Sequence, residues 1–164
     1  MALLTEELRA LVGRQAVYVS PEEFGLAAGR YFARAVGDDN PLYTSTEAAR
    51  AVGLPGPVLP PTLLFETNSY TDLPRDDEGF AGHSWGVSPP GTRAVRGGNT
   101  YTWERDVLPG DRVTATWTVQ DVTERTTRAG RPMVVLTSGC RYEAADGGLI
   151  GEQTETLVFL AVET

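Results

Sequence analysis

The sequence predicts an α+β fold in which helices come first and an antiparallel sheet follows. Apolar residues recur at helical spacing in several segments before residue 70, whereas from about residue 97 they alternate with polar residues. The clearest alternation lies in 112–122, and turn sequences separate it from similar neighbours. Helices followed by consecutive strands are typical of an α+β domain. A chain of 164 residues, 41% of them hydrophobic, predicts one domain over 1–164 with its own core.

The N-terminal half of the chain predicts three helices. Their expected ranges are 5–13, 20–37 and 45–53. The middle segment has the strongest signals, because Ser20 can cap its start, Pro21 suits a first helical position and Gly37 can end it. In the third segment Ser45 or Thr46 is the expected N-cap. The residues expected to form the core-facing stripe of the middle helix are Phe24, Ala27, Ala28, Tyr31, Phe32 and Ala35.

A proline-rich stretch and a long loop separate these helices from the strands. The prolines are Pro55, Pro57, Pro60 and Pro61. They favour extended backbone, and Pro61 can begin a helix with the apolar residues that follow it. Residues 72–95 are rich in Gly, Pro, Asp and Ser and have no apolar period, which predicts a loop. Loops of that length are usually functional or disordered.

The C-terminal half predicts four strands. Their expected ranges are 99–107, 112–122, 131–144 and 150–163, separated by the turn sequences PGD, RTTRAG and ADGG. Trp103 and Trp117 are expected to pack on the sheet. Cys140 is expected to be a buried, inert thiol, as free cysteines in strands usually are.

The composition argues against several classes of function. The net charge of −8 opposes nucleic-acid binding, which needs clustered cations. All 14 basic residues are arginines, so a Schiff-base lysine, pyridoxal phosphate attachment and a P-loop lysine are excluded. Cys140 and His83 are the only cysteine and histidine, which leaves no intrachain disulfide and no zinc-ligand spacing. We therefore expect no metal and no cofactor.

The N-terminal sequence does not predict targeting to a membrane. It is acidic and amphipathic, whereas a secretory signal is basic and then apolar. No apolar run approaches the ~20 residues that span a bilayer. We expect a cytoplasmic protein with no membrane and no nucleic acid among its partners.

The segment GDDNPLY, residues 37–43, has two interpretations. The structural one is a helix stop, because Gly supplies positive φ, Asp and Asn bond nearby backbone, and Pro prevents continuation. The functional one is an acid held over a substrate, with Asp38 as that acid. A histidine at position 43 would favour catalysis, but the sequence has Tyr43.

The wider setting of this segment favours the functional interpretation. The stretches ARAVGDDNPLYTSTEAARAVGLPGPVLPPTLLF and RGGNTYTWERDVLPGDRVTATWTVQDV follow in that order. Together they resemble the MaoC-like hydratases and dehydratases of the hot-dog fold, specifically the N-terminal MaoC domain, also called the fatty-acid-synthase-I-like dehydratase domain. The resemblance covers roughly residues 5–162. It implies an antiparallel sheet wrapped around a long central helix at about 61–70, and pairing of two such units.

The resemblance also implies a chemistry. Catalytic members carry an Asp, four intervening residues and a His, which bind the water that adds to or leaves C3 of an acyl thioester. Such a reaction needs groups that exchange protons near neutral pH. Backbone N–H groups at the start of the central helix can hold the carbonyl as charge develops. Asp38 matches the motif aspartate and Asn40 the amide that follows it, but a tyrosine with a pKa near 10 is a poor base.

Two further departures accompany Tyr43. Arg96 precedes Gly97 and Gly98 where relatives often have a histidine, and the segment 60–62 replaces the His-Gly of many active members. The pattern resembles the noncatalytic partner in two-subunit members, which shapes the acyl-binding cavity. Two alternatives stay open: a self-sufficient hydro-lyase that uses Asp38 with Tyr43, and a binding module for acyl-thioester or polyketide intermediates without turnover.

The resemblance and the long loop add further candidate residues. His83 can cover the mouth of the substrate site, or it can be a structural loop histidine. Arg93 and Arg96 can bind a phosphate of coenzyme A or phosphopantetheine, or they can be solvated surface residues. The candidate substrate-binding set is Pro61, Thr62, Trp85, Arg93, Arg96, Gly97 and Gly98. The expected partners are an acyl-CoA or acyl-carrier-protein thioester and a second hot-dog chain, identical or catalytic.

Overall fold

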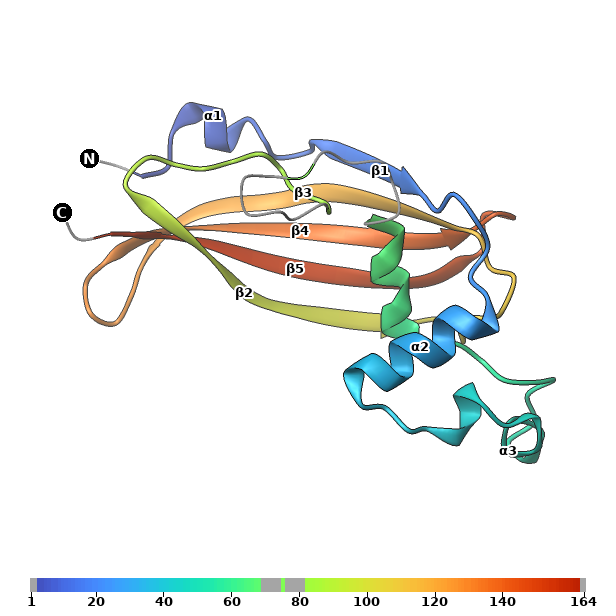
Figure 1. Cartoon of the computed structure of the whole chain (residues 1–164). Coiled ribbons are helices and arrows are strands. Elements are labelled where there is room, and N and C mark those ends of the chain that lie inside the picture. Colours follow the sequence, from blue (N-terminus) through green and yellow to red (C-terminus); the bar gives the residue numbers. More distant parts are fainter. Residues whose placement is uncertain (1–2, 69–74, 76–81, 163–164) are drawn as a thin grey trace.

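A five-stranded antiparallel sheet forms the body of the protein, seen in a computed structural model that describes residues 3–68, 75 and 82–162. Its strand order is β1-β3-β4-β5-β2 (Figure 1). The strands are β1 (Gln15–Val19), β2 (Thr92–Trp103), β3 (Val113–Thr126), β4 (Pro132–Ala144) and β5 (Leu149–Ala161). The helices are α1 (Glu6–Arg9), α2 (Leu26–Val36) and α3 (Thr46–Ala51), with 3₁₀ helices η1 (Pro41–Tyr43) and η2 (Pro61–Asn68). The predicted α+β class is confirmed.

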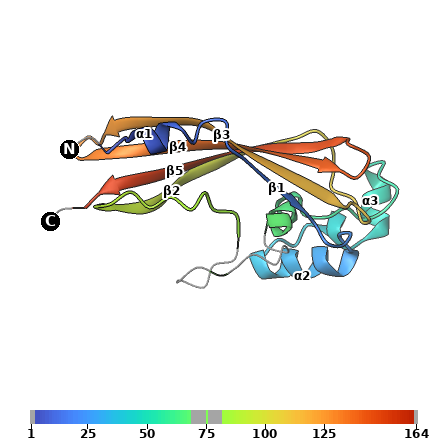
Figure 2. The same cartoon turned by 90° about the horizontal axis from the view of Figure 1, so that it is seen from above.

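The helix η2 occupies the place expected for the central helix. It crosses one face of the sheet, and α2 and α3 lie on the same side of the sheet (Figures 1 and 2). Leu63 and Leu64 are 1% and 0% exposed, so η2 is anchored in the core. The expected helix ran to residue 70, which lies outside the described residues; the described part is a 3₁₀ helix of eight residues.

The α2 helix begins later than the sequence predicts. Its N-cap is Gly25 rather than Ser20. The Ser20 hydroxyl instead accepts a hydrogen bond from the Val113 N–H at 2.9 Å. The Phe24 N–H donates to the Asp111 carbonyl, so residues 20–24 are held along the start of β3 and cannot enter the helix.

The expected core-facing stripe is confirmed in part, because Phe24 is buried and Ala28 and Phe32 pack against the core. Gly29 and Ala33 are buried, whereas Tyr31 is 66% exposed. A Cβ on Gly29 would come within 2.6 Å of the Leu59 side chain, so this glycine allows the helix to pack closely. The helix therefore contacts the chain just before η2 through its small residues.

The sequence did not predict the two edge strands, β1 and β2, with their observed bounds. Strand β1 was not predicted; its five residues pair with the first half of β3. Strand β2 begins at Thr92, inside the expected loop, because residues 92–96 pair with β5. The β2–β5 register shifts between Arg96 and Gly98, which is a β-bulge.

The main core lies between the sheet and the segments that cross it. Trp117 and Cys140, which face each other across β3 and β4, are 2% and 1% exposed. The expected burial of Cys140 is confirmed, and this burial raises the pKa of its thiol to about 12. Within the described residues, no helix is both long and apolar enough to cross a bilayer.

Candidate functional site

The segment 37–43 forms the turn that its residue types predict. Gly37 ends α2 with φ 75°, and the Asp38 N–H donates to the Ala33 carbonyl at 2.8 Å. The Asp38 carboxylate accepts from the Asn40 N–H at 3.1 Å, and the Asn40 side-chain oxygen accepts from the Leu42 N–H at 3.0 Å. These bonds are helix-stop chemistry, and they also fix where the acid and the amide lie.

Tyr43 is buried at the end of this turn. Only 9% of the residue is exposed, and it packs with Ala33 and Val58. Burial and the negative charge of Asp38 raise the pKa of the Tyr43 phenol. Its hydroxyl interacts with the side chains of Asp38 and Asn40. At neutral pH this hydroxyl is therefore a protonated hydrogen-bond donor.

Two cavities meet at Tyr43 and Asn40. One, of about 320 Å³, is also lined by Arg30, Arg34 and Asp38. The other, of about 390 Å³, is lined by Pro61 at the start of η2 and by residues of the turn after β2. Asp38 lines the first cavity and Pro61 the second, and both cavities share Tyr43 and Asn40. Thr62 is exposed and does not line either cavity.

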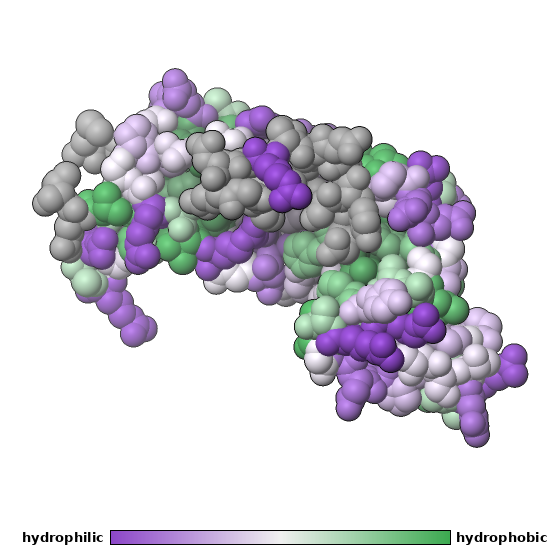
Figure 3. Space-filling view, viewed as in Figure 1, coloured by the Kyte–Doolittle hydropathy of each residue, from purple (hydrophilic) through white to green (hydrophobic). Residues whose placement is uncertain are grey.

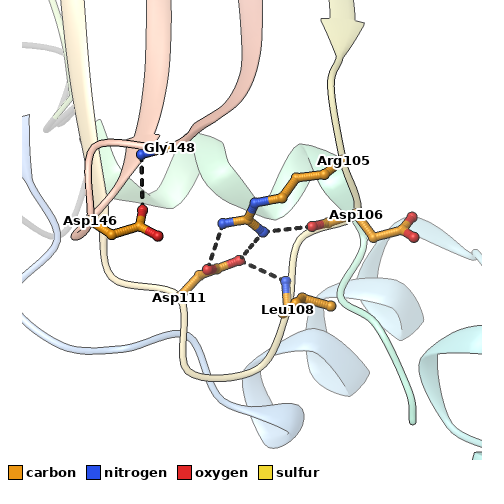
Figure 4. Close-up of polar contacts among 6 residues, drawn as sticks. All are labelled: Arg105, Asp106, Leu108, Asp111, Asp146 and Gly148. Atoms are coloured by element: carbon orange, nitrogen blue, oxygen red, sulfur yellow. Dashed lines mark hydrogen bonds and ion pairs between the residues drawn. The ribbon is translucent and has the colours of Figure 1, made fainter. Parts of the chain in front are cut away.

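An arginine that the sequence did not single out orders the wall of the larger cavity. Arg105 makes two parallel bonds of 2.8 Å to the Asp111 carboxylate and a third to the Asp106 carbonyl (Figure 4). Asp111 also accepts from the Leu108 N–H at 2.7 Å. The pair raises the pKa of Arg105 and fixes the turn between β2 and β3. The turn lies where the segment that contains α2 and α3, residues 26–51, joins the sheet. Apolar residues are exposed at this junction (Figure 3).

His83 lies in a separate place, on the face of the sheet. Its Nδ1 is 2.8 Å from the Tyr18 hydroxyl oxygen. Its ring stacks on Trp117, with centroids 4.4 Å apart, and meets Trp85 edge-on at 4.6 Å. Burial first, and then the charges of Arg96 and Arg14, lower the pKa of His83 to about 4. The imidazole is therefore neutral at physiological pH.

A third cavity, of about 280 Å³, adjoins this histidine. Trp85, Arg96 and Leu157 line it, whereas Asp38 and Tyr43 do not. Arg96 is paired with Glu155, with nitrogen and oxygen 2.6 Å apart. The sequence-predicted residues thus divide into two groups, one in the turn between α2 and α3 and one on the sheet.

The remaining candidates lie on β2. Arg93 is exposed, next along the strand from Ala94, which lines the third cavity. Gly97 sits at the bulge, where an added Cβ would come within 3.2 Å of the Thr156 carbonyl oxygen. Gly98 has φ 143°, a conformation that favours glycine. The glycine pair has a clear structural role in the bulge.

The depressed pKa of His83 predicts acid sensitivity. Because the folded pKa is about 4 and the unfolded value about 6.5, the unfolded chain binds a proton first as pH falls. Stability is thus expected to fall between pH 6.5 and 4, as measured by urea unfolding. In His83→Phe that part of the slope should disappear. An equal slope between pH 6.5 and 5 in both proteins would contradict this.

Comparison with known proteins gives one family match and several structural likenesses. Residues 11–151 match the family described as FAS1-like, dehydratase domain region. The UPF0336 protein SCO4636 of Streptomyces coelicolor is 35% identical over 114 residues, covering 70% of this chain and 72% of that protein.

Two solved complexes from Mycobacterium tuberculosis have similar chains. A chain of the ChsH1–ChsH2 complex has a TM-score of 0.67 at 20% identity, over 91% of this chain and 85% of that chain. A chain of the C-terminally truncated HadBC complex, a (3R)-hydroxyacyl-ACP dehydratase, has a TM-score of 0.58 at 28% identity, over 88% and 96%. With the five-stranded sheet, these likenesses confirm the predicted hot-dog fold.

Proposed function

The chain belongs to the FAS1-like dehydratase domain family, and from that membership we propose that it is a subunit of an (R)-specific enoyl-thioester hydratase or 3-hydroxyacyl-thioester dehydratase. In this proposal it shapes the substrate site, while a partner hot-dog chain supplies the catalytic Asp and His. The substrate is an acyl-CoA or acyl-carrier-protein thioester. The expected cytoplasmic location and the single domain over 1–164 are parts of the same proposal.

The observation that carries the proposal is the state of Tyr43. Dehydration removes a proton from C2 of the thioester and protonates the C3 hydroxyl, which leaves as water; hydration is the reverse. A group that takes part in both proton transfers must titrate near neutral pH. Burial and Asp38 move the pKa of Tyr43 upward from 10, away from that range. Tyr43 can hold a substrate oxygen by a hydrogen bond but cannot take the place of a histidine base.

The free edge of the sheet supports the need for a partner. Strand β2 is twelve residues long and pairs only with β5 among the described strands. Residues 93–100 are exposed. A long exposed edge strand presents unpaired N–H and carbonyl groups, which other chains can pair with. The similar chains of HadBC and ChsH1–ChsH2 each come from a complex, which agrees with a two-chain assembly.

The test measures hydration of crotonyl-CoA by the chain alone, by a MaoC-like chain that carries the Asp and His, and by the two co-expressed. We expect no turnover by the chain alone, co-elution of the two chains, and at least a tenfold higher rate than the partner alone, about 1.4 kcal/mol of activation free energy. A homodimer that no such partner affects would contradict the proposal. Substrate binding without turnover in any mixture would favour a binding module instead.

A self-sufficient hydro-lyase is the second candidate, because Asp38, Asn40 and Tyr43 line one cavity. In that case the chain alone is active and Asp38→Asn lowers kcat by about 10²-fold or more, the usual worth of a general base. Asp39→Asn removes the neighbouring carboxylate and is the matched control. Equal rates in Asp38→Asn and Asp39→Asn would end this candidate.

A further inference from the structure

The histidine on the face of the sheet has one ring nitrogen that lacks a partner. His83 Nδ1 is 2.8 Å from the Tyr18 oxygen, whereas Nε2 is buried and bonds to none of the residues that the structure describes. A neutral imidazole has one donor and one acceptor nitrogen, and a phenol is a strong donor. With Tyr18 donating to Nδ1, the proton is on Nε2. A buried N–H without an acceptor is a cost that a ligand can remove.

The surroundings hold this donor in a fixed position. Trp117 covers one face of the His83 ring, and Trp85 meets it at an interplanar angle of 89°. Trp85 is itself fixed, because its indole N–H donates to the Ser138 hydroxyl at 2.8 Å and its carbonyl accepts from Arg14 at 3.1 Å. A donor that does not have to be ordered on binding contributes more of its hydrogen-bond energy to affinity.

The adjoining cavity of about 280 Å³ limits the kind of ligand. Its apolar lining comes from three elements: Val87 from the segment before β2, Ala94 from β2, and Leu157 and Phe159 from β5. Its charged lining is the Arg96–Glu155 pair, in which the guanidinium already has its carboxylate. Charge is thus balanced within the wall, so the cavity favours an uncharged, largely aliphatic ligand.

We infer that this cavity binds an aliphatic group that carries an uncharged acceptor oxygen, a ketone or a hydroxyl, and that His83 Nε2–H donates to that oxygen. The inference rests on the proposed function, in which the aliphatic group is part of the acyl chain. The cavity does not include Asp38 or Tyr43, so the oxygen concerned lies away from the turn at 37–43. His83 is then a specificity-determining residue that favours oxygenated acyl chains over plain ones.

The first test uses the fact that His83 is the only histidine. Two-dimensional ¹⁵N–¹H spectra of the protein labelled with ¹⁵N-histidine report this imidazole alone. We expect a neutral ring protonated on Nε2 from pH 6 to 8, and a mixture of tautomers in Tyr18→Phe. A ring protonated on Nδ1 in the unmodified protein would overturn the inference, since Nε2 could not donate.

The second test compares 2-heptanone with 2-methyl-1-heptene, in which a methylene group replaces the carbonyl oxygen. Titrated at equal concentrations below the solubility of the alkene, the ketone is expected to bind about five- to tenfold more tightly, the usual worth of one hydrogen bond to a buried donor. His83→Phe keeps an aromatic ring on Trp117 but removes the donor, and should abolish the preference. Equal binding of both ligands, or an unchanged preference in His83→Phe, would overturn the inference.

A competition experiment separates this inference from the proposed function. S-octanoyl-N-acetylcysteamine, a short acyl thioester, is added to the protein with 2-heptanone bound. Displacement of the ketone supports both the cavity and its place in an acyl-binding site. If the protein still prefers the ketone over the alkene but the thioester does not displace the ketone, His83 binds an oxygen but the cavity does not bind the acyl chain of a thioester. That result would contradict the link to the proposed function and leave the His83 site intact.

Discussion

Replacement of Trp117 by alanine is expected to lower the free energy of unfolding by about 3–5 kcal/mol, the range for removal of a large aromatic side chain from a core. Trp117 is 2% exposed and belongs to the main core cluster. It also supports the stacked imidazole of His83. The change therefore opens a cavity in the core. It also removes the ring on which the His83 imidazole stacks. Urea unfolding at pH 7 gives the measurement.

Two controls separate the packing role of Trp117 from strand propensity. Thr116→Ala changes the neighbouring residue, whose side chain lies on the other face of β3, and should cost less than about 1 kcal/mol. Trp117→Phe keeps a ring in the core and should cost less than Trp117→Ala. If Trp117→Ala and Thr116→Ala were equally destabilising, the core position of this tryptophan would be wrong.

Replacement of Asp111 by alanine is expected to cost about 2–3 kcal/mol. The Asp111 side chain is 12% exposed and accepts both bonds of the Arg105 fork and the Leu108 N–H. Removal of one partner of a buried pair costs about 3–5 kcal/mol, and the partial exposure of Arg105, 33%, reduces that cost. Thermal unfolding at pH 7 in low and high salt gives the measurement.

Asp106→Asn is the matched control for Asp111→Ala. Arg105 bonds to the main-chain carbonyl of Asp106, so the substitution leaves that bond in place and should change stability by less than about 0.5 kcal/mol. Because Arg105 lines the cavity at Tyr43, Asp111→Ala should also weaken binding of S-octanoyl-N-acetylcysteamine if that cavity takes the substrate. Equal melting temperatures for both variants would contradict a structural role for the pair.

Local chemistry explains what the sequence predicted well. The alternation in β3 follows from one buried face, so its strand and the burial of Trp117 were visible in the residues themselves. Ser45 caps α3 by accepting from the Ala48 N–H, as its position indicates. The turn at Asp38 and Asn40 also forms by bonds to its own backbone.

What the sequence did not predict depends on partners far along the chain. Strand β1 has only five residues and needs β3, about 100 positions later, to define it. Ser20 has the residue type of an N-cap, but pairing with Val113 decides its conformation. The contact of Tyr18 with His83 spans 65 positions, and no periodicity within either segment indicates it. Long-range pairing overrode local propensity in each case.

The bulge in β2 also constrains which chains can add to its free edge. Arg96 pairs with Leu157 and Gly98 with the next residue, Thr156, so Gly97 is an extra residue that interrupts the alternation of side chains along β2. A regular strand can therefore pair with both 92–96 and 98–103, as β5 does, but at Gly97 it meets a bend and an unpaired residue. The bulge thus divides the free edge into two shorter stretches, which makes indiscriminate strand addition along its whole length less favourable.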